Sequence, residues 1–260
     1  MPGRLRPPAS LIWLLAICAL GLSPDGAARA EPAPVVFCFN AWPPYAFQQE
    51  DGIAGISIEI MAAAARRAGY APDFVELPWN RCIQSVETGA VHAVLDAARR
   101  DGLLQGPESY SAYTNTFWVR PDSRIRTARP GAFGGLRIGL VSGYEYPASL
   151  LADVAANGLT VDYSVDDGAN VRKLAFGRVD VIVADRISTR WMLRQDAIEL
   201  RPLAPDHSAD TLYPSFNPAF RERHRRIDAA LAEMRQAGEI DAVIRKYVGK
   251  AKDPNQIDTN

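Results

Sequence analysis

Apolar runs and helical patterns alternate along the first part of this chain. Residues 35–39 form an unbroken apolar run, which is typical of a buried strand. Between residues 57 and 68 the apolar side chains recur every three or four positions, which predicts an amphipathic helix that ends at Gly69. The same pattern predicts strands at residues 73–77 and 91–95 and a short helix at residues 80–87. Strands that alternate with helices in this way predict a mostly parallel sheet flanked by helices.

The rhythm changes near Tyr113, and a second unit of the same kind follows. Asp167 is expected to cap a helix at residues 169–176, because an aspartate side chain can accept a hydrogen bond from the free N–H groups at a helix start. The other elements predicted here are an extended segment at 116–120, strands at 137–141, 159–163 and 179–184, a helix at 147–156, extended segments at 199–203 and 211–216, and a long helical region at 218–247 broken by Gly238.

The first thirty residues have the features of an export signal. Arg4 and Arg6 precede an apolar stretch at residues 11–22, and residues 28–30 read Ala-Arg-Ala, a small-residue cleavage pattern. An apolar stretch of this length is short for a membrane span. We therefore expect a cleaved signal peptide at residues 1–30 and a periplasmic mature protein. An uncleaved anchor and a lipoprotein attached through Cys18 are the alternatives.

Charge and cysteine content narrow the functional class. The formal net charge of −1 supplies no general basic field for binding nucleic acid. Cys38 and Cys82 remain after removal of the leader, and in an exported protein they are expected to form a disulfide; two buried thiols are the alternative. The sequence shows no metal-ligand spacing and no catalytic motif, so we expect no metal, no cofactor and no catalytic residue.

Aromatic residues mark the candidate binding site. Residues 42–45 read Trp-Pro-Pro-Tyr directly after the first predicted strand. Trp42 and Tyr45 are thus expected at the carboxyl end of a strand, where open α/β sheets bind small ligands. Trp79 and Arg81 open the next helix. These rings predict a rigid aromatic wall for a small ligand; the alternative is that they only pack in the core.

In their order and spacing these features resemble the periplasmic solute-binding proteins of polar amino-acid-type ABC transporters, known as family 3. The resemblance covers residues 33–249 and rests on the Trp-Pro-Pro-Tyr turn and on several later segments. These are residues 51–60, 89–94, 143–144, 177–185, 233–238 and 244–247.

The resemblance implies an α/β, two-lobed periplasmic-binding-protein-like fold of type II. Each lobe would be a mixed, mostly parallel sheet flanked by helices, with the ligand cleft between the lobes. Lobe 1 would comprise residues 31–115 and, after the chain returns, residues 211–260. Lobe 2 would comprise residues 116–210.

The resemblance also implies ligand-binding residues in both lobes. Asp96 and Arg99 stand where family members place hydroxyl groups, and Tyr144 and Glu145 fall in a ligand-contacting segment of lobe 2. Asp185 matches the acidic residue that receives the ammonium group of the ligand. The complete set of candidates is Trp42, Tyr45, Trp79, Arg81, Asp96, Arg99, Tyr144, Glu145 and Asp185.

One departure from the family pattern concerns the ligand. Leu104 falls near the place of the arginine that clamps the α-carboxylate in the family. Arg99 could bind a carboxylate instead, or it could be a solvated surface charge. The departure argues against a standard α-amino acid. Separately, the candidate acids Asp96, Glu145 and Asp185 outnumber the candidate arginines and are joined by three aromatic rings. This balance predicts a small polar ligand with a cationic nitrogen, and a zwitterion is a further option.

The function expected from the sequence is therefore capture of a small polar, amino-acid-like or cationic ligand by hinge closure. The protein would be a monomer that delivers the ligand to an ABC permease. A sensory input protein for a membrane receptor would have the same lobes. A periplasmic dehydratase on this fold, with Asp96 or Glu145 as general acid, is the enzymatic alternative.

Overall fold

The computed structural model describes residues 31–128 and 132–248, together with Gly3. The predicted signal peptide and the C-terminal tail lie outside the described residues. Residues 1–31 and 32–260 are separate units, and the second unit carries the fold. Within the described part of this chain, no helix is both long and apolar enough to cross a bilayer.

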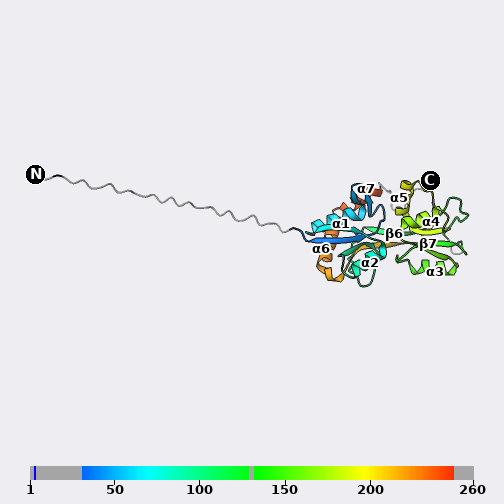
Figure 1. The fold of residues 1–260 in the computed structure, drawn as a ribbon, viewed down its shortest axis with the longest axis horizontal. Helices are drawn as coiled ribbons and strands as arrows, with labels where there is room; N and C mark the ends of the chain where they lie inside the picture. The colour runs from blue at the N-terminus through cyan, green and yellow to red at the C-terminus, as the bar shows by residue number, and fades with distance from the viewer. Residues whose placement is uncertain (1–2, 4–30, 129–131, 249–260) are drawn as a thin grey trace. The chain divides into compact units, whose positions relative to one another are not determined.

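The fold is a mixed sheet with helices on both faces (Figure 1). Its strands lie in the order β4-β1-β5-β11-β6-β9-β7-β8, and β10 pairs with β6. The strands are β1 (Pro34–Phe39), β2 (Phe47–Gln49), β3 (Gly52–Ala54), β4 (Ala71–Glu76), β5 (Ala93–Ala97), β6 (Ser111–Val119), β7 (Arg137–Val141), β8 (Thr160–Ser164), β9 (Val181–Asp185), β10 (Arg201–Pro202) and β11 (Ser208–Phe216). The helices are α1 (Ile56–Arg67), α2 (Trp79–Glu87), α3 (Ala148–Ala156), α4 (Asp167–Ala175), α5 (Arg186–Asp196), α6 (Arg221–Gln236) and α7 (Glu239–Val248), with a 3-10 turn at Pro218–Phe220.

The first half of the sheet is built around β1, which pairs in parallel with β4 and β5. Side chains alternate across a strand, so β1 serves two cores. Val35, Phe37 and Phe39 pack with α1 and the C-terminal helices, whereas Val36 and Cys38 pack with α2 on the opposite face. This half of the sheet is therefore a three-layer sandwich.

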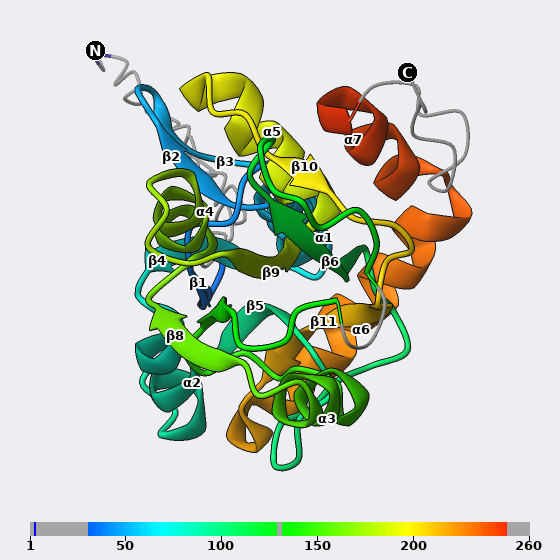
Figure 2. The same ribbon diagram turned by 90° about the vertical axis from the view of Figure 1, so that its right-hand side faces the viewer.

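The second half has the same three-layer plan. Strand β7 pairs in parallel with β8 and β9. On one face Ile138 and Leu140 of β7 pack with α3, and on the other Trp118 and Ile182 pack with α4 and α5. Figures 1 and 2 show α3 and α4 on opposite sides of these strands.

Strands β6 and β11 join the two halves. They pair antiparallel with each other through residues 111–115 and 208–212. Beyond that region β11 pairs with β5 of the first half, and β6 pairs with β9 of the second. The chain thus enters the second half along β6 and returns along β11, before α6 packs on α1. The predicted mixed, mostly parallel sheet flanked by helices is confirmed.

Two local predictions differ from the structure. Asp166, and not Asp167, caps α4: its carboxylate accepts a hydrogen bond of 2.6 Å from the Ala169 N–H. Asp167 is the first residue inside the helix, and its side chain turns into the protein. Helix α5 was not predicted, because few of its residues are apolar; it begins at the cap formed by Asp185.

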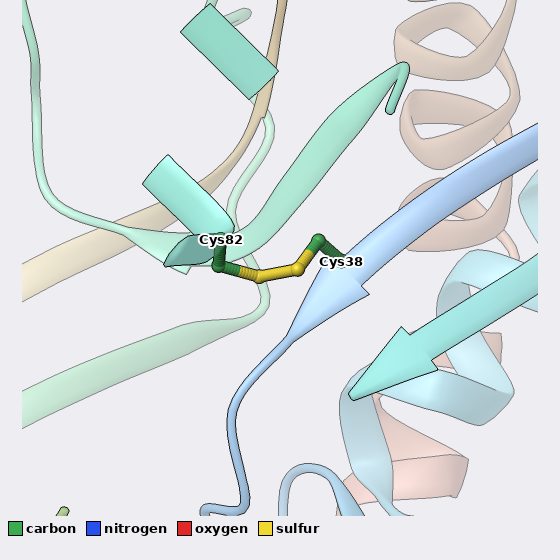
Figure 3. The surroundings of a disulfide bond; sticks show 2 residues. All are labelled: Cys38 and Cys82. Carbon is green, nitrogen blue, oxygen red and sulfur yellow. A yellow bond between two sulfur atoms is a disulfide. The ribbon is translucent and has the colours of Figure 1, made fainter. Parts of the chain in front are cut away.

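The disulfide between Cys38 and Cys82 is confirmed (Figure 3). The two Cα atoms are 5.6 Å apart, within the usual range for a bridge. The bond links the end of β1 to the first turns of α2. It therefore holds together the two elements that carry the aromatic turn and Trp79.

Candidate functional site

A pocket lies where β1, β5, β6 and β11 meet the loop that follows β7. Its empty space is about 500 Å³, including the part that is open to solvent. Among the described residues that line it, none is lysine or arginine. Five of the lining side chains are aromatic, three are acidic and four are amides or aliphatic: Trp42, Trp79, Tyr113, Tyr144 and Tyr146; Asp96, Glu145 and Asp210; and Asn40, Ala98, Asn115 and Leu212.

Trp42 is the aromatic wall on the first half. Its ring stacks on Tyr45 at a centroid distance of 4.1 Å and lies 5.9 Å from the ring of Tyr113. The turn is held by the start of α1, where the N–H of Ser57 donates to the carbonyl of Tyr45 at 2.9 Å. Gly55 permits this approach: its φ is +130°, and a Cβ there would lie 2.1 Å from the same carbonyl. Tyr45 is thus a buried support behind Trp42 and does not itself line the pocket.

Trp79 connects the start of α2 to the loop after β7. Its indole Nε1 donates a 3.0 Å hydrogen bond to the carbonyl of Gly143. The adjacent Asn80 amide donates to the hydroxyl of Ser142 at 3.2 Å. Gly143 has φ +82°, and a Cβ there would lie 1.7 Å from the Asn80 amide oxygen. The two halves therefore touch directly at this edge of the pocket.

Asp96 is the acidic residue at the end of β5. It has a φ of +56°, a left-handed conformation that is uncommon for a residue other than glycine. One oxygen of its carboxylate accepts hydrogen bonds from Ser57 at 3.0 Å and Ser111 at 2.6 Å. Burial raises the pKa of Asp96 to about 6, although both hydroxyl bonds favour the charged form.

Asp167 lies behind two tyrosines of the pocket, and sequence reasoning missed it. The hydroxyls of Tyr113 and Tyr144 each donate to it at 3.0 Å, one to each carboxylate oxygen. The two rings meet edge to face at 5.7 Å. Burial raises the pKa of Asp167 to about 7. One sequence signal could have identified it. Asp166 and Asp167 are adjacent, and a helix cap needs only one of them.

Asp185 has a structural role at the end of β9. Its side chain is fully buried and does not line the pocket. The carboxylate accepts hydrogen bonds of 2.8 Å from the N–H groups of Ser188, at the start of α5, and Thr114. Burial raises its pKa to about 6, although backbone bonds favour the charged form. Arg186 does not neutralise it, because that side chain pairs with Asp206.

The predicted cationic candidates lie outside this pocket. Arg81 is exposed on α2. The Arg99 guanidinium donates to the carbonyls of Gln105 and Gly106 at 3.0 Å and lies 3.8 Å from the ring centre of Tyr213. Arg99 does line the adjoining hollow at the pocket mouth.

The structure thus brings together five of the nine predicted residues and separates the others. The five that line the pocket are Trp42, Trp79, Asp96, Tyr144 and Glu145, of which Glu145 also pairs with Arg100. Tyr45 and Asp185 support the site from behind. Sequence reasoning missed pocket residues on the two joining strands, and no motif marks them: Tyr113, Asn115, Asp210 and Leu212.

No group of three histidine, cysteine, aspartate or glutamate side chains is placed to hold a metal ion in the described ranges. The chemistry that the pocket offers is therefore that of aromatic faces and carboxylates. Such an arrangement can bind a small cation non-covalently.

Several known proteins are similar to this chain in sequence or in fold. PatH of Vibrio harveyi, named as an amino-acid ABC transporter-binding protein, is 23% identical over 246 residues, which cover 91% of this chain and 97% of PatH. A histidine kinase sensor domain similar to periplasmic binding proteins superposes with a TM-score of 0.76 at 20% identity, covering 85% of this chain and 98% of that one. An ancestral arginine-binding protein bound to arginine gives a TM-score of 0.75 at 18% identity, covering 84% and 100%.

These solved structures share the two-lobed fold of periplasmic binding proteins, and the sheet described above has that architecture. The model of the bacterial extracellular solute-binding proteins, family 3, matches residues 35–250. This chain therefore belongs to the bacterial extracellular solute-binding proteins of family 3.

Proposed function

We propose that this protein captures a small cationic ligand between its two lobes and delivers it to an ABC permease. The observation that carries this proposal is the lining of the pocket: aromatic and acidic side chains without a lysine or arginine among the described residues. A cation gains from both, since the faces of aromatic rings and carboxylates attract positive charge.

The buried carboxylates strengthen the argument. No described lysine or arginine forms an ion pair with Asp96, Asp167 or Asp185, and burial raises the pKa of each. Burying an unpaired carboxylate is costly, and a bound cation would supply the missing countercharge. Three such groups around one pocket favour a positively charged ligand over a neutral or anionic one.

The lobes in this proposal are residues 31–115 with 211–260, and residues 116–210. A ligand that touches Trp42 of the first lobe and Tyr144 of the second would favour the closed form, because only contacts made in one form shift an equilibrium. Direct contacts between Trp79 and Gly143 and between Asn80 and Ser142 support closure at the same edge.

Titration calorimetry tests the proposal. L-arginine, putrescine and choline are the cationic probes, and glucose and L-glutamate are the neutral and anionic controls. We expect binding of at least one cation and none of the controls. Binding of the controls alone would contradict a cation site. Native mass spectrometry of the protein as purified would add any ligand that is carried along.

A sensory role is the second candidate, supported by the similarity to a histidine kinase sensor domain. Chemical cross-linking in cells would separate the two, since capture of a permease supports transport and capture of a receptor kinase supports sensing. The dehydratase alternative has less support. Its prephenate-type substrates carry carboxylates, which the acidic lining would repel.

A further inference from the structure

The carboxylate of Asp167, behind the pocket wall, offers negative charge but few free lone pairs. Both oxygens of Asp167 already accept hydrogen bonds from the hydroxyls of Tyr113 and Tyr144. Asp96 is similar on one side, where a single oxygen accepts bonds from two serine hydroxyls. Because tyrosine and serine hydroxyls already donate to these carboxylate oxygens, few acceptors remain for a ligand that carries several N–H groups.

The remaining acids of the lining are engaged in the same way. Asp210 accepts a 2.6 Å hydrogen bond from the Asn115 amide. Glu145 forms an ion pair with Arg100. The lining therefore presents a negative field whose hydrogen-bonding capacity is largely used within the protein.

The aromatic rings, by contrast, form the apolar part of the lining. Trp42, Trp79, Tyr113 and Tyr144 all line the pocket, and they come from both halves of the sheet. Tyr144 meets Trp79 at 5.8 Å and Tyr113 at 5.7 Å, each time edge to face, whereas Tyr113 is nearly parallel to Trp42. Rings at such different angles can surround a rounded cation.

These two features select between kinds of cation. A primary ammonium group loses three hydrogen bonds to water on entry and needs acceptors to replace them. A quaternary ammonium group has no N–H, so it loses no hydrogen bond and is held by ring faces and by the surrounding charge. The pocket supplies the aromatic rings and the negative charge that a quaternary ammonium group needs. It supplies few of the free acceptors that a primary ammonium group requires.

We propose that the cationic centre of the ligand is a quaternary or fully N-alkylated ammonium group held in a cage of Trp42, Trp79, Tyr113 and Tyr144. Asp167 lies behind the cage and holds the two tyrosine rings in place. This inference rests on the proposed capture of a cation and narrows it to one chemical class.

Matched pairs of ligands test the inference on the unmodified protein. Choline and ethanolamine differ only in N-methylation, as do glycine betaine and glycine. By titration calorimetry we expect the methylated member of at least one pair to bind about tenfold or more tightly than its partner. Equal or tighter binding of the primary amines would overturn the cage, and so would the failure of every methylated probe to bind at millimolar concentration.

The outcomes also separate this inference from the proposed function. Binding of arginine, putrescine or ethanolamine without binding of the methylated probes keeps the cation site and removes the cage. Binding of only neutral or anionic solutes removes both.

Variants of Tyr144 locate the cage. Tyr144→Leu removes the ring and is expected to weaken binding of the methylated probe about tenfold, whereas Tyr144→Phe keeps the ring and most of the affinity. Tyr163→Leu, at an exposed tyrosine of β8, is the matched control and keeps wild-type affinity. Wild-type affinity in a folded Tyr144→Leu protein would overturn the assignment of this ring.

Discussion

The hydroxyl of Tyr144 donates a 3.0 Å hydrogen bond to Asp167 and accepts one of 3.2 Å from the Asn40 amide. Asn40 follows β1, whereas Asp167 begins α4, so a single phenol oxygen joins the two halves of the sheet through the pocket wall. The ring itself is also packed edge to face against Trp79 and Tyr113, and the carboxylate is the hydrogen-bond partner whose charge also reaches the ligand.

Substitution of Asp167 tests that carboxylate. Asp167→Asn removes the negative charge but keeps the size, so we expect the affinity for a bound cation to fall about tenfold. Calorimetry measures it. Asp166→Asn is the control, because asparagine also caps helices and the α4 cap should survive. Equal losses in both variants would show that Asp167 acts only through the helix.

Stability should depend on pH in a direction set by the buried acids. The pKa values of Asp96, Asp167 and Asp185 are raised to about 6, 7 and 6, so the folded protein binds protons more tightly than the unfolded chain. Their contribution to the free energy of unfolding is fully present below the pKa of about 4 that these groups have in the unfolded chain. It is lost as the pH rises through their pKa values in the folded protein. Urea unfolding from about pH 5 to 8 should show a weaker decline for Asp167→Asn than for the wild type. An equal decline of the free energy of unfolding with pH in both proteins would contradict this prediction.

Ligand binding should show the opposite trend. A bound cation favours the charged carboxylates, so its affinity should rise with pH up to about 7 and its binding should release protons. Calorimetry near neutral pH in two buffers of different ionisation enthalpy detects this release. An apparent enthalpy that does not depend on the buffer would rule out the linkage.

Gly143 should be sensitive to a single methyl group. Gly143→Ala places a Cβ in contact with the Asn80 amide and disfavours the φ of +82°. We expect the Trp79–Gly143 contact to loosen and ligand affinity to fall severalfold, with only a small change in melting temperature. Gly158→Ala is the control, since it has a φ of +61° but no neighbour within 4 Å. The same loss of affinity in both variants would exclude a specific contact.

Removal of the disulfide should lower stability without moving the site. The bridge closes a loop with a sequence separation of 44 residues, for which chain entropy predicts about 4 kcal/mol of stabilisation. Cys38→Ser with Cys82→Ser should therefore lower the melting temperature by many degrees. A double variant as stable as the wild type would show that the packing of β1 on α2 suffices.

Asp185→Ala tests whether Asp185 only caps α5 or also contacts the ligand. It removes the acceptor for two N–H groups, the buried one of Ser188 and the partly buried one of Thr114, so we expect a loss of about 2 kcal/mol in the free energy of unfolding. Asp185→Asn should recover part of that loss. If Asp185 also binds the ligand, as the resemblance implies, affinity falls about tenfold in both variants; an unchanged affinity leaves only the cap.

Much of the fold could be predicted from the sequence, because its signals are local. The run at residues 35–39 and the helical spacing at residues 57–68 correspond to β1 and α1 within one or two residues. Helix α5 lacks such a signal, since packing of Met192 and the cap at Asp185 define it. Its cap uses the carboxylate that sequence reasoning reserved for a ligand.

The site was predictable only where it follows a motif. Trp42 and Trp79 follow recognisable turns, and both line the pocket. Tyr113 and Asp210 lie on β6 and β11, and only the pairing of these strands brings them to the same place. Either Asp166 or Asp167 could cap α4 on sequence grounds. Only the three-dimensional structure shows that Asp166 is the cap and that the side chain of Asp167 is buried behind the pocket.

The junction through β6 and β11 restricts how the molecule can move. Two neighbouring strands that share a ladder of hydrogen bonds bend and twist as one ribbon. Relative motion of the halves then has few independent directions, unlike that of domains on a flexible tether. A pair of spectroscopic labels, one in each half, would accordingly report a narrow range of separations and not a broad distribution.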